Sequence, residues 1–285
     1  MGQQGSRGIN LCVEFNFKQY MKRGVDLSYE TIVVEKKDHV ARITFNRPDR
    51  LNAVNSILGL EVKEALEEIA ADEEIRVLVL TGNPRIREKE GQQEIKHCFS
   101  AGWDLSETAP VEPIVEMLAT YEKPVIAMVN GFALGGGCEI ALACDFIFAA
   151  DTSEIGLPEI SRGLLPGWGG TQRLPRRIGV SRAKRMILGG ETVSGTEAKN
   201  IGLVDEVYNK EGLDRAVSDF AATLSSRPPL GLKKIKEVIN KGIDVDLQSG
   251  LKLEQEALGF LLQTEDFQEG IAAFMEKREP RWTGR

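Results

Sequence analysis

The sequence has few cysteines, histidines and aromatic residues, and each scarcity excludes a class of protein. Four cysteines in 285 residues, with no Cys-x-x-Cys pair, are too few for a disulfide-stapled domain. We expect them to be reduced, as in a cytoplasmic protein. The only two histidines, His39 and His97, fit no catalytic or metal-ligating pattern, so we expect no metal site. No apolar run approaches the roughly 18 residues that a membrane span requires.

The charge balance is acidic, at −7, and argues against a nucleic-acid-binding surface. Hydrophobic residues make up 42% and charged residues 28%, as in an ordinary soluble globular protein. Phosphate-loop, dinucleotide and His-Glu-x-x-His motifs are missing, so nucleotide hydrolysis, redox and zinc chemistry lack support. We expect no nucleic-acid partner, no membrane association and no cofactor.

Residues 1–28 are polar and carry scattered basic residues without a continuous apolar stretch, so a secretory signal is not expected. We expect these residues to be a flexible N-terminal extension, or to result from translation at an upstream start codon, with Met21 as the natural first residue. An organelle-targeting segment is the weaker alternative, because Glu14 and Asp26 count against it.

Hydrophobic periodicity predicts an α/β fold. Residues 39–45 alternate as a half-buried strand, with residues 29–36 as its hairpin partner across Lys37-Asp38. Residues 56–71 have one apolar helical face, and 75–80 form a continuous apolar run typical of a buried parallel strand. The rhythm repeats as helix 112–120, strand 124–129, helix 137–144 and strand 145–149. After residue 210 the pattern is helical, with breaks at 227–229 and 244–246.

Residues 83–96 are highly charged, and we expect a solvated loop there. The alternative is that its basic residues help to bind the phosphates of a ligand.

A run of glycines and two glutamates form the most informative pattern. Gly135, Gly136 and Gly137 permit a close backbone approach and precede Glu139, where the chain turns helical. Glu159 follows twenty residues later, behind a proline. Free N–H groups at a helix start and two placed carboxylates are suited to moving protons at carbon beside a carbonyl.

Six blocks resemble the crotonase (enoyl-CoA hydratase/isomerase) superfamily, over about residues 29–285. They are residues 46–48 (NRP), 51–53 (LNA), 99–105 (FSAGWDL), 130–139 (NGFALGGGCE), 163–175 (GLLPGWGGTQRLP) and 276–282 (EKREPRW). The resemblance implies a ββα spiral core at 29–210 and a C-terminal helical trimerisation subdomain at 211–285. It also implies homotrimers that pair into homohexamers.

The resemblance also implies the site. Glu139 and Glu159 would hold one water, and the backbone amides of Gly136 and Trp103 would stabilise the thioester oxygen of an acyl-CoA. The positions implied for coenzyme A are Arg50, Leu51, Asn52, Ala101, Asp104, Leu105 and Gly135, with Phe274 and Lys277 reaching it from a neighbouring subunit. Lys277 has an alternative reading as an ordinary last-turn helix lysine.

Trp103 and Trp168 depart from the family, which often has small residues at both positions. The stretch that contains Trp103, residues 99–105, resembles that of carnitinyl-CoA dehydratase. The indole rings of Trp103 and Trp168 either border the acyl group, which could then be cationic or cyclic, or pack into the core.

Two glutamates together favour an enoyl-CoA hydratase or the reverse dehydratase, and an enoyl-CoA isomerase is the nearest alternative. A non-catalytic CoA- or RNA-binding scaffold is the alternative from another class.

Overall fold

The computed structural model describes residues 29–89 and 91–285. Two main β-sheets, of six and four strands, form the centre of the described fold. The larger sheet has the order β1-β2-β3-β7-β9-β12, and all neighbours are parallel except β1 and β2. Its strands are β1 (Ile32–Lys37), β2 (Val40–Phe45), β3 (Val77–Gly82), β7 (Val125–Val129), β9 (Phe146–Ala150) and β12 (Glu206–Tyr208). The expected extension at residues 1–28, which includes Cys12, lies outside the described residues.

The smaller sheet carries the site. Its order is β11-β10-β8-β6, with β6, β8 and β10 parallel. The strands are β6 (Cys98–Ser100), β8 (Phe132–Leu134), β10 (Glu154–Gly156) and β11 (Thr192–Ser194). The helices near it are α3 (Ile114–Ala119), α4 (Gly136–Ala143), α5 (Gly170–Ile178), α6 (Val180–Gly189) and α7 (Gly195–Asn200).

The hairpin of β1 and β2 turns at Asp38 and His39, one residue later than the sequence predicted. Both residues have positive φ, at 49° and 67°. A two-residue hairpin turn of the primed type needs positive φ at both central residues, which explains the position. The predicted inward face of β2, Ala41, Ile43 and Phe45, is fully buried.

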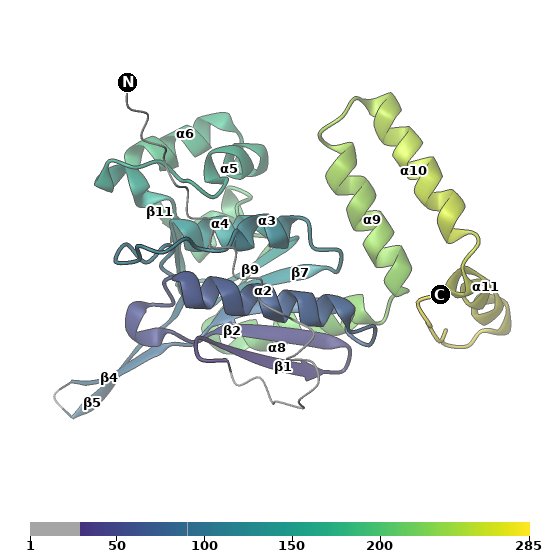
Figure 1. Cartoon of the computed structure of the whole chain (residues 1–285), viewed down its shortest axis with the longest axis horizontal. Coiled ribbons are helices and arrows are strands. Elements are labelled where there is room, and N and C mark those ends of the chain that lie inside the picture. Colours follow the sequence, from purple (N-terminus) through teal and green to yellow (C-terminus); the bar gives the residue numbers. More distant parts are fainter. Residues whose placement is uncertain (1–28, 90) are drawn as a thin grey trace, which may run out of the picture.

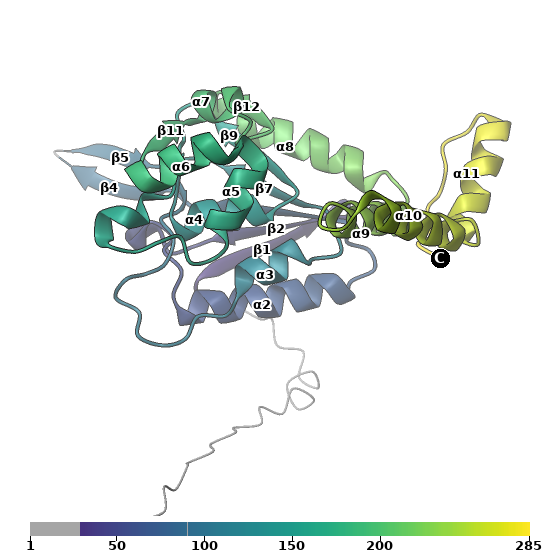
Figure 2. The same cartoon turned by 90° about the horizontal axis from the view of Figure 1, so that it is seen from above.

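The central strands divide their side chains between two apolar clusters. In β3, Leu78 and Leu80 join the main cluster beneath α2 (Ser56–Ala71), while Val77 and Val79 join a second cluster beneath α8 (Lys210–Ser225). The all-apolar run is therefore a strand covered on both faces. Figure 2 shows α2 and α8 on opposite sides of the large sheet.

Helix α8 lies at the start of the predicted helical subdomain. We expected the helical subdomain to begin at residue 211, but α8 packs on the large sheet through Leu213, Val217 and Ala221. We propose that α8 belongs with the spiral core, because its apolar stripe completes the second apolar cluster. The segment that stands away from the sheets begins at Pro229.

That segment, the helical arm, comprises α9 (Pro229–Gly242), α10 (Leu247–Leu261) and α11 (Glu265–Glu276) (Figures 1 and 2). No residue of α9 or α10 is buried. Near the start of the arm, Nζ of Lys236 lies 2.6 Å from Oδ2 of Asp145 on the core, and it also donates to the carbonyl of Lys123.

The charged segment at 83–96 is a hairpin and not the loop that we expected. Strands β4 (Arg85–Lys89) and β5 (Gln92–Lys96) pair in register and project from the body of the fold (Figure 1). Its side chains are mostly exposed, as expected for a solvated segment. Across the described residues, the structure contains no helix long and apolar enough to cross a membrane.

Candidate functional site

The carboxyl ends of three parallel strands bring the glycine and glutamate motifs together. β6, β8 and β10 end at Ser100, Leu134 and Gly156. The chain continues from them into the 101–105 loop, the start of α4, and the 3-10 helix η2 (Pro158–Arg162) that carries Glu159. Ligands of α/β proteins commonly bind at this edge of a sheet. The topology therefore gathers segments that are distant in sequence.

Gly102 and Gly136 lie in direct backbone contact. A Cβ built on Gly102 would be 2.6 Å from the nitrogen of Gly136, and Gly102 has φ of +88°. A Cβ on Gly137 would lie 2.0 Å from the carbonyl oxygen of Ser100. Side chains are excluded at these positions because one backbone segment lies against the other.

Two backbone N–H groups are free at this contact. Val54 donates to the carbonyl of Gly102 and accepts from Asp104, at 2.7 and 2.9 Å, which leaves the N–H of Trp103 between them without an acceptor among the described residues. Gly136 is the first residue of α4, where an N–H has no partner within the helix. The α4 dipole also favours negative charge there.

Glu139 is a buried carboxylate, with 2% of its surface exposed. Its Oε1 accepts two backbone hydrogen bonds of 2.7 Å, from the N–H groups of Trp168 and Gly170. Burial raises the pKa of Glu139, while the two donors act in the opposite direction and the charge of Glu159 adds to the increase. Both bonds fall on Oε1, so Oε2 is left for another partner.

Glu159 is half-buried on η2, and its Oε2 is a buried oxygen with no hydrogen-bond partner in the described structure. Burial raises the pKa of Glu159. A Cβ on Gly135 would lie 3.1 Å from Oε1 of Glu159, so this carboxyl reaches the start of α4. A buried acceptor without a donor is costly. A water or a carboxyl proton at Oε2 would remove that cost.

The two tryptophans differ in their surroundings. Trp103 is 46% exposed and does not pack into the core. Trp168 is partly buried against the main cluster, and its six-membered ring lies over Gly136, where an added Cβ would meet Cζ3 at 2.5 Å.

The expected CoA positions near the sheet edge come together in two adjoining loops. The N–H of Ala101 donates to the carbonyl of Leu51 over 2.9 Å. Arg50 and Leu105 are exposed beside this contact. Asn52 is fully buried, and its amide donates to the carbonyls of Cys98 and Asn83, so its side chain orders the loop.

Asp104 also has an internal role. Ser106 donates to its Oδ1 at 2.6 Å and Arg47 donates to its Oδ2 at 3.0 Å. The hydrogen bond from Ser106 is the main cause of its lowered pKa, and Arg47 contributes less. The sequence motif included Arg47 without indicating this contact.

Phe274 and Lys277 are not brought to the site within one chain. Both are exposed and lie on α11 or just beyond it, toward the end of the helical arm and away from α4 (Figures 1 and 2).

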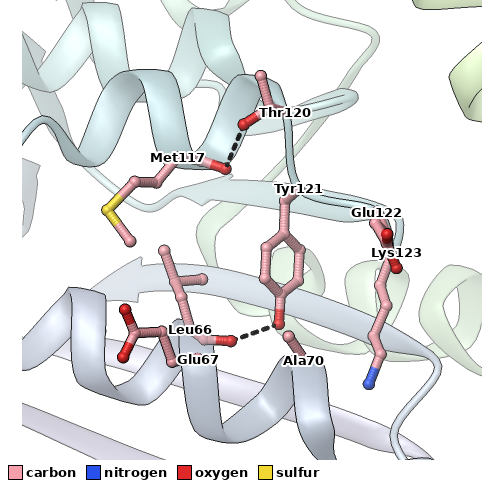
Figure 3. Close-up of a pocket in the computed structure, with 8 residues that line it drawn as sticks. All are labelled: Leu66, Glu67, Ala70, Met117, Thr120, Tyr121, Glu122 and Lys123. Carbon is pink, nitrogen blue, oxygen red and sulfur yellow. Dashed lines mark hydrogen bonds between the residues drawn. The ribbon is translucent and has the colours of Figure 1, made fainter.

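A separate cavity of about 270 Å³ lies between α2 and the segment after α3 (Figure 3). Tyr121 spans it and donates to the carbonyl of Leu66 at 3.0 Å. None of the expected site residues lines this cavity.

The main missed contributions are backbone donors. The N–H groups of Trp168 and Gly170 bind Glu139, but backbone groups carry no residue-type signal in a sequence.

Comparison with known proteins agrees with this architecture. The family model described as enoyl-CoA hydratase/isomerase matches residues 35–285. The chain is 38% identical to 2,3-dehydroadipyl-CoA hydratase of Escherichia coli, over 89% of this chain and 99% of that protein. It is 36% identical to crotonyl-CoA hydratase of Syntrophomonas wolfei, over 89% and 98%. The crystal structure of enoyl-CoA hydratase from Bacillus anthracis aligns with a TM-score of 0.82 at 38% identity, over 90% of this chain and 100% of that one. The chain therefore belongs to the enoyl-CoA hydratase/isomerase family, as its motifs indicated.

Proposed function

We propose that this protein is an enoyl-CoA hydratase, which adds water reversibly across the C2=C3 bond of an α,β-unsaturated acyl-CoA. The observation that carries the proposal is the convergence of two carboxyl groups of raised pKa, Glu139 and Glu159, beside two free backbone N–H groups. Relatives whose names state hydration of related thioesters support it.

The thioester oxygen accepts hydrogen bonds from the N–H groups of Trp103 and Gly136. These donors stabilise the negative charge that develops on this oxygen when water attacks C3. Each donor of this kind contributes roughly 2.7–4 kcal/mol to the transition state. Neither donor has another acceptor among the described residues, so both are available before the substrate arrives.

The carboxyl groups divide the proton transfers. Glu139 accepts two backbone donors on one oxygen, an arrangement that favours its ionised form, so it takes a proton from the attacking water. Glu159 has an unpartnered buried oxygen, which favours its protonated form, so it delivers a proton to C2. The water oxygen bonds to C3, the electron pair of the double bond moves toward the thioester carbonyl, and C2 then gains the proton. Each carboxyl ends in the other's protonation state, and one proton returns between turnovers. No metal or redox cofactor takes part in these steps.

Coenzyme A binds along the two adjoining loops. Arg50, Leu51, Ala101, Leu105 and Gly135 form the contacts to its pantetheine part, while Asn52 and Asp104 hold the loop shapes.

The arm supports a proposal of assembly as a homotrimer, with paired trimers as hexamers. Its apolar side chains remain exposed, including Ile239, Ile243 and Phe274, and a groove of about 650 Å³ separates α9 from the core. Such apolar surface is typical of an interface. In the assembly, Phe274 and Lys277 meet the nucleotide end of CoA bound to a neighbouring subunit. Light scattering tests the assembly, and a monomeric, active protein would contradict it.

The proposed location of the protein is the cytoplasm.

The direct test mixes the protein with crotonyl-CoA and follows loss of the conjugated thioester absorbance. Glu139→Gln and Glu159→Gln should each abolish the loss, while the surface control Glu191→Gln should retain it. If the wild type did not hydrate crotonyl-CoA but isomerised a 3-enoyl-CoA, and if Glu139→Gln retained that isomerisation, the isomerase would be supported instead. Loss of crotonyl-CoA unaffected by both substitutions would refute the assigned roles. A salt-sensitive RNA complex without turnover would favour the binding scaffold.

A further inference from the structure

The indole of Trp168 covers the same residue that supplies one of the proposed oxyanion donors. A Cβ on Gly136 would lie 2.5 Å from Cζ3 and 2.6 Å from Cε3 of Trp168, below the 3.0 Å limit of real Cβ contacts. The six-membered ring therefore rests directly on the Cα of Gly136. No side chain other than hydrogen fits between the ring and the backbone at this point.

Both polar backbone groups of Trp168 are engaged. Its N–H donates to Oε1 of Glu139 over 2.7 Å, and its carbonyl accepts a hydrogen bond of 2.9 Å from Nη1 of Arg173. The ring packs partly against the main apolar cluster. With its backbone anchored by two hydrogen bonds and its ring against Gly136, the indole forms one wall of the site.

An acyl group bound as proposed must pass close to this wall. Its thioester oxygen meets the N–H of Gly136, and its C2 and C3 atoms lie within reach of Glu139 and Glu159. A flat ring beside these atoms accepts a planar, unbranched enoyl group. A substituent at C2 projects from the chain next to the carbonyl, on the part of the acyl group that lies nearest to Gly136 and therefore nearest to the ring.

We propose that Trp168 is a specificity-determining residue that restricts the enzyme to acyl groups without a branch at C2. The inference rests on the proposed hydratase function and narrows its substrate class. A pocket that lacks room for one methyl group discriminates by roughly 10- to 200-fold. Trp103, whose side chain is largely exposed, does not form this wall.

The test compares kcat/KM for crotonyl-CoA with that for its 2-methyl analogue, tiglyl-CoA. The wild type should favour crotonyl-CoA by at least about tenfold, and Trp168→Ala should shift the ratio toward tiglyl-CoA by about tenfold or more. Trp168→Phe should give an intermediate ratio. The control Leu165→Ala, at an exposed position of the same loop, should leave the ratio unchanged.

A structural role for the ring would have a different signature. If Trp168→Ala lowered both values of kcat/KM equally, the ring would only support the loop and the proposal would be overturned. Wild-type turnover of tiglyl-CoA equal to that of crotonyl-CoA would overturn it as well.

The binding of saturated thioesters separates this inference from the proposed function. Calorimetry with butyryl-CoA and 2-methylbutyryl-CoA measures the wall without any chemical step. If the wild type bound butyryl-CoA more tightly than 2-methylbutyryl-CoA and Trp168→Ala removed this difference, the role of Trp168 would be supported even if crotonyl-CoA were not hydrated. Equal affinities in both proteins would overturn it.

Discussion

The backbone N–H of Trp168 donates a 2.7 Å hydrogen bond to Oε1 of Glu139, while its indole lies on Gly136. One residue thus contacts both the buried carboxylate and the backbone of the proposed oxyanion donor. Moving its loop would disturb the proposed proton transfer and the proposed oxyanion stabilisation together. A substitution at Glu139 should therefore change both the stability of the fold and the activity of the site.

Glu139→Gln should stabilise the protein near neutral pH while abolishing hydration. Burial raises the folded-state pKa of Glu139 above the ordinary 4.5, so the folded protein binds this proton more tightly than the unfolded chain does. The stability from this group is full at low pH and is lost as the pH rises through the raised pKa. Glutamine keeps the Oε1 acceptor for both backbone donors but carries no charge.

The measurement is thermal denaturation of both proteins across a pH series. The melting temperature of the variant should exceed that of the wild type at neutral pH, and the excess should shrink as the pH falls. Glu191→Gln, at an exposed site, should show no such trend. A wild type that is the more stable protein at neutral pH would mean that the hydrogen bonds outweigh burial.

Gly102→Ala should impair turnover more than it impairs binding. The new methyl group would lie 2.6 Å from the nitrogen of Gly136, and φ of +88° is unfavourable for alanine. Disturbing one oxyanion donor lowers kcat by about 10²- to 10³-fold. Steady-state kinetics with crotonyl-CoA and calorimetry with CoA measure the two effects. The control is Gly167→Ala, which has no atom within 4 Å of its added Cβ. A kcat near that of the wild type would be inconsistent with this backbone contact.

Charge reversal on the β4–β5 hairpin tests its second interpretation. β4 contacts η1 (Pro48–Arg50), and neither Arg85 nor Arg87 forms an ion pair within the described residues. If these cations meet the CoA phosphates, the double variant Arg85→Glu/Arg87→Glu should raise KM for crotonyl-CoA by about fivefold, or roughly 1 kcal/mol. KM for crotonyl-pantetheine, which lacks the nucleotide, should not change. Equal KM values for the wild type and the variant would leave the hairpin as a solvated insertion.

Lys236→Met should destabilise the junction between the arm and the core. The side chains of Lys236 and Asp145 are only 9% and 18% exposed, and the substitution leaves Asp145 without its cation. Breaking a buried pair costs about 3 kcal/mol. Chemical denaturation measures the loss, and Lys241→Met, whose pair with Glu237 is surface-exposed, should cost far less. Similar losses in the two variants would contradict the importance of this junction.

The local sequence pattern was sufficient to predict most central elements. Helix 56–71 forms as expected, and α4 and the predicted strands β2, β3, β7 and β9 agree to within two residues. Strand β1 begins three residues later than predicted. Period-2 alternation in β2 and the continuous apolar run in β3 report burial directly, because each residue's environment follows from its place in the pattern. The glycines and glutamates were recognisable for a similar reason, since their chemistry depends on residue type.

Other features were decided by tertiary structure. The sequence showed α8 as one more C-terminal helix, and only the structure shows that it packs against β3, β7 and β9. The many charges of residues 83–96 led us to predict a loop, but the segment is a hairpin in which Ile86 and Ile95 pair across the strands. The motif implied Asn52 as a CoA contact, and only the structure shows that its amide donates to two backbone carbonyls.

The sequence by itself determined the family, the two carboxylates and the glycines that permit close backbone contact. Only the tertiary structure decided what those carboxylates touch and where Trp168 lies. The physical reason is that the donors to Glu139 are backbone N–H groups from a loop about thirty residues away. Every residue except proline has such a group, so its direction is fixed by the fold and not by the residue type.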